Sequence, residues 1–158
     1  MPMRKSMLVL LSLALILSGC MESVNDTVNP EQELFDDAVF IDEDAHVKLT
    51  WSIDSVATIR IAFEKNEGPN VDLYTMTELN YEDYKRCAEG EESTFYYMEE
   101  LSDPDTAAAN LEADIDAGTY VTVIVNTDCG QAKPPDQSGL FSSDENDRAG
   151  VDYRITAQ

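Results

Sequence analysis

This sequence has very little positive charge and almost no histidine. Its 158 residues include 10 Lys and Arg against 32 Asp and Glu, with one His and three Cys. A field this negative repels nucleic acids and anionic lipid headgroups, so neither is expected as a ligand. Without a Cys-x-x-Cys pair, the one His does not predict a zinc site. His46 falls on the polar side of an alternating segment, where a solvated side chain is expected.

Motifs for nucleophilic catalysis and phosphate binding are also missing. The single His lies in no catalytic pattern, and the sequence contains neither a Gly-x-Ser-x-Gly stretch nor a glycine-rich phosphate loop. Acid pairs of the kind that glycosidases use occur throughout so acidic a chain, so they carry no information. The sequence predicts a protein that is not an enzyme and has no cofactor, with a hydrolase as a minor alternative.

Long hydrophobic runs are absent except near the N-terminus. Residues 7–17 are apolar apart from Ser12, and they follow Arg4 and Lys5. As a helix this run rises about 16 Å, which is too short for a hydrocarbon core of about 30 Å. A charged start, a short apolar middle and small residues at the end are typical of an export signal.

The four residues at the end of this run, Leu17-Ser18-Gly19-Cys20, resemble the lipobox of prokaryotic lipoproteins. In that family the cysteine sulfur carries a diacylglyceryl group and the chain is cut just before it. The resemblance implies removal of residues 1–19, lipidation of Cys20 and attachment to the extracytoplasmic face of the cell membrane. The alternative is an ordinary export signal that ends near a cysteine.

The remaining chain divides into a tether and one domain of ordinary size. Residues 20–36 are polar without periodicity and are expected to be flexible, so the domain is predicted at residues 37–158. Without residues 1–19 the chain keeps 8 basic and 32 acidic residues, a formal charge of −24. At molar salt the Debye length is about 3 Å, which screens such self-repulsion. We interpret the acidity as halophilic, with divalent-cation binding as the alternative.

Calcium prefers oxygen ligands, and several acidic runs fall in expected loops. None has the EF-hand spacing of alternating acids followed by glycine. Asp144 and Asp147 are the first candidates for Ca²⁺, because the loop at residues 127–149 is long enough to wrap an ion. A solvated acidic face is the alternative.

Two cysteines, Cys87 and Cys129, remain after the expected cleavage. Outside the cell an even number of cysteines predicts a disulfide. Closing a loop of about 43 residues stabilises a fold by roughly 4 kcal/mol in the chain-entropy account. Two buried free thiols are the alternative.

Alternation of apolar and polar residues predicts seven strands. They fall at residues 46–53, 56–65, 71–77, 93–101, 108–115, 119–126 and 151–158. Residues 119–126 are apolar on nearly both faces, which is typical of a central strand. Residues 35–41 fit either an edge strand or a turn of helix. One short helix is expected over residues 81–87, with Asn80 as its N-cap and Asp83 three residues later.

Seven or eight strands with one short helix predict an all-β fold, an antiparallel two-sheet β-sandwich of jelly-roll type. Two stretches, NVDLYTMTELNYEDY (70–84) and AGTYVTVIVNTDCG (117–130), resemble small secreted β-sandwich modules of the pre-peptidase C-terminal type, found beside proteases in bacteria and archaea. The resemblance implies a jelly-roll-like sandwich that serves ligand or matrix attachment. A lipid anchor stands here where that family has a protease, which weakens the analogy of function.

Five tyrosines in the central third are candidate ligand-binding residues: Tyr74, Tyr81, Tyr84, Tyr96 and Tyr97. Exposed on a sandwich face, such rings stack on sugars or contact proteins. Packing of the helix on the sandwich edge is the favoured alternative. The sequence thus predicts a lipid-anchored cell-surface sandwich that binds or presents a protein or carbohydrate partner. The alternative is a structural or accessory subunit of a membrane or envelope complex.

Overall fold

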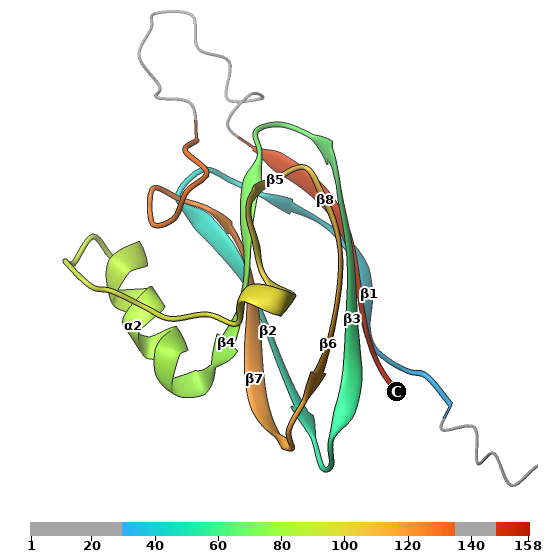
Figure 1. Ribbon diagram of the computed structural model, residues 1–158. Coiled ribbons are helices and arrows are strands. Elements are labelled where there is room, and N and C mark those ends of the chain that lie inside the picture. The colour runs from blue at the N-terminus through green and yellow to red at the C-terminus, as the bar shows by residue number, and fades with distance from the viewer. Residues whose placement is uncertain (1–29, 135–147) are drawn as a thin grey trace, which may run out of the picture.

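The computed structural model describes residues 30–134 and 148–158. The predictions for the export signal, Cys20, Asp144 and Asp147 lie outside these described residues. Two antiparallel four-stranded sheets form the two layers of a sandwich (Figure 1). Sheet A has the strand order β1-β8-β3-β6, and sheet B has the order β2-β7-β4-β5. The all-β, two-sheet sandwich predicted from the alternation is therefore confirmed.

The strands largely follow the alternating segments of the sequence. Sheet A consists of β1 (Gln32–Ile41), β8 (Ala149–Ala157), β3 (Ala57–Glu67) and β6 (Ala108–Ile115). Sheet B consists of β2 (Ala45–Ile53), β7 (Gly118–Asn126), β4 (Val71–Thr77) and β5 (Asp103–Thr106). Because β7 lies between β2 and β4, the prediction of a central strand there is confirmed.

The domain begins earlier than predicted. Residues 35–41, which the sequence left open, belong to the edge strand β1. That strand starts at Gln32, inside the stretch 20–36 that was expected to be a flexible tether. Glu33 and Phe35 flank an irregularity in its pairing with β8, and this break hides the two-residue period at the start of the strand.

Two further predictions are wrong between β4 and β6. The helix α2 (Glu78–Ala88) begins before Asn80, since Thr77 is its N-cap and accepts a hydrogen bond from the Asn80 backbone N–H at 3.4 Å. Residues 91–98 form no paired strand, and the 3₁₀ turn η1 (Glu99–Leu101) follows them. The short strand β5, which contains a proline, was not predicted.

The main core lies between the two sheets. Its fully buried side chains include Ile59, Ile61, Leu73, Leu101, Ile124 and Ile155. Trp51 packs here as well, and its indole N–H donates to the Thr122 hydroxyl at 3.1 Å, so its one polar group is satisfied. Burying each large apolar side chain contributes about 1.5–3 kcal/mol. The core therefore provides a firm scaffold for the two outer faces of the sandwich.

Candidate functional site

The outer face of sheet B is covered by other parts of the chain. Helix α2 and residues 91–98 lie on the side of this sheet that faces away from sheet A (Figure 1). Beneath them Tyr74, Val121 and Val123 are at most 2% exposed and form a second core with Tyr84 of the helix. This face is consequently occupied and unable to receive a partner without rearrangement.

Most of the candidate tyrosines belong to this second core. Tyr74, Tyr81 and Tyr84 are 2%, 7% and 0% exposed. Tyr97 is partly buried, and its ring centroid lies 4.7 Å from that of Tyr74. Tyr96 is 71% exposed and so is the one displayed to solvent. The structure therefore brings four of the five together as packing between α2, the 91–98 segment and sheet B.

His46 is not the solvated residue that its place in the alternation predicted. It lies on the outer face of β2, but α2 covers that position, so its imidazole Nε2 is 3.4 Å from the Tyr81 hydroxyl. Its ring also meets Tyr84 edge-on with 5.2 Å between centroids. Burial, and to a smaller extent the charge of Lys48, lowers the pKa of His46.

The predicted disulfide is present. Cys87 in the last turn of α2 is bonded to Cys129 in the loop after β7, with 5.7 Å between the two Cα atoms. The bond joins the covering helix to the sheet that it covers. It thus fixes α2 over the aromatic side chains beneath it.

A buried carboxylate next to this second core holds strand β5 and the loop after β7 together. Asp72 Oδ1 accepts the backbone N–H groups of Asp105 and Ala132 at 2.8 and 2.9 Å, and Oδ2 accepts that of Gln131 at 3.0 Å. Burial raises the pKa of Asp72, while these three N–H groups favour its ionised form. A Cβ on Gly130 would lie 1.9 Å from Oδ2, so only glycine fits there. Asp72 therefore acts as a structural acceptor.

Neither a metal site nor a membrane span is found in the described part of the chain. Residues 30–134 and 148–158 contain no cluster of three or more His, Cys, Asp and Glu side chains suited to an ion. Over the same ranges no helix combines the length and apolar character needed to cross a bilayer.

The outer face of sheet A is exposed, and its side chains form regular rows across the strands. Strand pairing sets these rows, because each outward residue faces its partner on the next strand. In the order β1, β8, β3, β6, the first row is Glu33, Thr156, Arg60 and Glu112; the second is Asp36, Arg154, Ala62 and Asn110; the third is Ala38, Asp152, Glu64 and Ala108.

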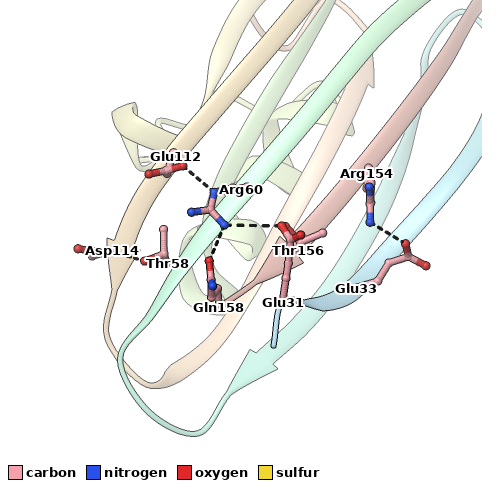
Figure 2. A network of polar contacts seen from close by, with 9 residues as sticks. All are labelled: Glu31, Glu33, Thr58, Arg60, Glu112, Asp114, Arg154, Thr156 and Gln158. Atoms are coloured by element: carbon pink, nitrogen blue, oxygen red, sulfur yellow. Dashed lines mark hydrogen bonds and ion pairs between the residues drawn. The ribbon is translucent and has the colours of Figure 1, made fainter. Parts of the chain in front are cut away.

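Arg60 organises the first row (Figure 2). Its Nε donates to Glu112 at 2.7 Å, and its Nη1 donates to the Gln158 side chain at 2.9 Å. The same Nη1 lies 3.6 Å from the Glu31 carboxylate, which also accepts the Thr156 hydroxyl at 2.6 Å. That hydroxyl, with help from Arg60, lowers the pKa of Glu31. Each charge here has an opposite charge beside it.

In the second row, Arg154 likewise pairs with acidic side chains on a neighbouring strand. Its guanidinium lies 3.3 Å from Glu33 and 3.8 Å from Asp36. Beside it the small side chains Ala62 and Asn110 leave two adjoining shallow depressions, of about 260 and 410 Å³, which share these two residues and Arg154 as lining. The outer face of sheet A, with these two shallow depressions, is the candidate functional site.

Sequence reasoning identified some of these side chains as outward but did not select them as a site. The alternation in β3 already placed Arg60 and Glu64 on the polar side. Their neighbours come from β8, β1 and β6, which lie up to a hundred residues away, so no local pattern could reveal the rows. No family model and no curated protein sequence matches this chain.

Proposed function

We propose that this protein is a non-enzymatic, lipid-anchored β-sandwich on the extracytoplasmic face of the membrane. In this proposal it binds a partner protein through the outer face of sheet A. The observation that carries the proposal is the contrast between the two outer faces. A helix held by a disulfide covers sheet B. Among the described residues, each strand of sheet A instead carries exposed outward side chains: Asp36, Arg154, Glu64 and Glu112.

The lipid anchor is supported by the motif that ends at Cys20 and by where the chain enters the domain. Residue 30 lies at the end of the sandwich where β1 begins (Figure 1). Nine residues lie between it and Cys20, so the two positions are at most about 35 Å apart along a fully extended chain. An anchored chain would hold this end of the sandwich toward the membrane and leave the opposite end toward the surroundings.

The form of the face favours a protein over a sugar or a small molecule. Sugar sites rely on exposed aromatic rings, whereas the two rings that line the depressions, Phe63 and Tyr153, are only 3% and 7% exposed. The exposed ring of Phe40 lies at the end of the face and already stacks with Arg148. Small-molecule pockets bury most of their ligand. The depressions of sheet A are shallow and polar, which suits contact with another polar surface.

The anchor is tested by the intact mass of protein extracted from membranes, compared with a Cys20→Ser variant. A chain that starts at Cys20 and carries a diacylglyceryl group supports the proposal. A lipid-free mass, with the wild type and the variant released equally, would reject the membrane-bound role.

A structural or accessory subunit of an envelope complex is the second candidate function, because a flat and exposed sheet face also suits a permanent interface. The two functions differ in how long the partner stays bound. Size-exclusion chromatography in mild detergent would give a stoichiometric complex for a subunit. A surface binder would elute as the single chain.

A further inference from the structure

The third row of sheet A differs from the first and second rows. Asp152 on β8 and Glu64 on β3 are direct register partners on the same exposed face. No ion pair joins either carboxylate to a cation within residues 30–134 and 148–158. The nearest arginine along β8, Arg154, already lies between Glu33 and Asp36. The row therefore carries two negative charges with no counter-charge.

Such a pair is a local defect in a sheet that is otherwise well matched. Like charges directly opposite each other destabilise an antiparallel pair. In the first row of the same sheet, β8 instead places Thr156 opposite Arg60, and Glu112 on β6 lies 2.7 Å from the Arg60 guanidinium. The first row, two rows away, thus holds an acid beside a cation, whereas the third row retains a mismatch that a bound cation would relieve.

The surroundings of the pair fit a long cationic side chain. Ala38 and Ala108 flank the two acids in the row, so the neighbours of the acids within the row have short side chains. The acids line the depression of about 410 Å³ together with Ala62 and Asn110. Asp36 and Arg154 line it as well, but the Arg154 guanidinium is paired with Glu33 and Asp36. The methylene stem of a lysine or arginine can lie along such small apolar side chains while its charged end meets carboxylates.

The edge of this area carries an exposed aromatic ring. Phe40 is 58% exposed and lies over Gly150, where an added Cβ would come within 2.9 Å of the ring. On its own chain the Arg148 guanidinium already stacks on this ring, 4.0 Å from its centroid. The Phe40 position therefore shows that a guanidinium packs well at this end of the face.

We propose that the third row of sheet A docks a basic protein surface, with one lysine or arginine of the partner placed between Glu64 and Asp152. The inference rests on the proposed function and deepens it by naming the partner chemistry. Charge complementarity selects this occupant, since the row is anionic, shallow and unpaired. The row also lies about 20 Å along β1 from the point where the chain enters, on the part of the face turned away from an anchor.

The first test measures stability. Glu64→Gln removes the like-charge pair, so it should raise the urea midpoint of unfolding. The matched control is Glu92→Gln, an exposed acid in the 91–98 segment, which should leave the midpoint nearly unchanged. A midpoint for Glu64→Gln that is equal to or below that of the wild type would overturn the idea that Glu64 and Asp152 repel each other in the folded protein.

The second test measures binding with a fluorescein-labelled pentalysine amide as the probe. Anisotropy is followed with the purified full-length protein, at the lowest salt concentration that keeps it folded. The double variant Glu64→Gln/Asp152→Asn should weaken binding about tenfold. The control Asp54→Asn/Glu92→Gln, which removes the same charge elsewhere, should weaken it less than twofold. Equal loss in both would mean non-specific attraction to an acidic protein and would reject the docking row.

The two proposals fail separately. The peptide assay measures binding to the outer face of sheet A, and its result does not depend on whether Cys20 is lipidated. Row-specific binding by a lipid-free protein would keep the docking surface and remove the anchor. A lipidated protein without row-specific binding would keep the anchor and remove the docking surface.

Discussion

At the scale of single residues, Asp72 and His46 show how tertiary contacts change the role of a side chain. Both alternate outward on strands of sheet B. Asp72 is nevertheless 0% exposed, because the loop at residues 130–132 closes over it. His46 is covered by α2. Each therefore makes a testable contribution to stability that its position in the strand does not reveal.

Asp72→Asn should destabilise the fold by about 2–3 kcal/mol, because the amide keeps only one acceptor oxygen and its NH₂ would face at least one backbone N–H and leave it unpaired. The measurement is urea unfolding followed by circular dichroism. Asp54→Asn, at an exposed turn, is the control and should change the free energy of unfolding by less than about 0.5 kcal/mol. Similar effects from the two variants would show that the three hydrogen bonds to Asp72 contribute nothing specific.

His46 should make stability depend on pH in the acid direction. Its pKa is lowered in the folded state, so the unfolded chain takes up the proton first, near pH 6.5. Its contribution is complete above that pH and is lost as the pH falls toward the folded pKa. Between pH 7.5 and 5.0 the wild type should therefore lose more stability than His46→Gln. The acidic residues are the same in both proteins and contribute equally to the loss. Equal losses of stability in the two proteins would therefore contradict a contribution from His46.

At the scale of elements, the strands that alternate along their whole length could be predicted and the segments shaped by packing could not. β2, β3 and β7 follow their patterns because each buries one face against the opposite sheet, and β7 buries its other face under α2 and residues 91–98. Phe95 and Tyr97 alternate in the same way, yet they do so to reach Tyr74, and their backbone pairs with no strand. The period alone does not distinguish these two causes.

The covering helix should depend on its disulfide more than the sheets do. In Cys87→Ser/Cys129→Ser the free energy of unfolding should fall by up to about 4 kcal/mol. Amide hydrogen exchange should accelerate most in α2, because the helix packs on only one side. Amides in the central strands β3 and β8 serve as the internal reference. An equal increase in the exchange rates of α2, β3 and β8 would show that the helix does not open independently of the sheets.

At the scale of the whole molecule, charge dominates the behaviour in solution. A net charge of −22 opposes the compact state, and salt screens that opposition. The urea midpoint of unfolding should therefore rise between 0.1 M and 3 M KCl. A midpoint that stays constant over this range would contradict the halophilic interpretation of the composition.

The position of β8 in sheet A has a consequence for the timing of folding. This strand is the last of the eight in sequence, yet it lies between β1 and β3, and β1 and β3 do not pair with each other. Until β8 has been synthesised, β1 has no strand to pair with in sheet A. The inner face of sheet B then lacks most of the sheet that packs against it. Contacts so distant in sequence form slowly. Sheet A therefore cannot be completed before β8 has been synthesised, so the sandwich closes after translation of the domain and not alongside it.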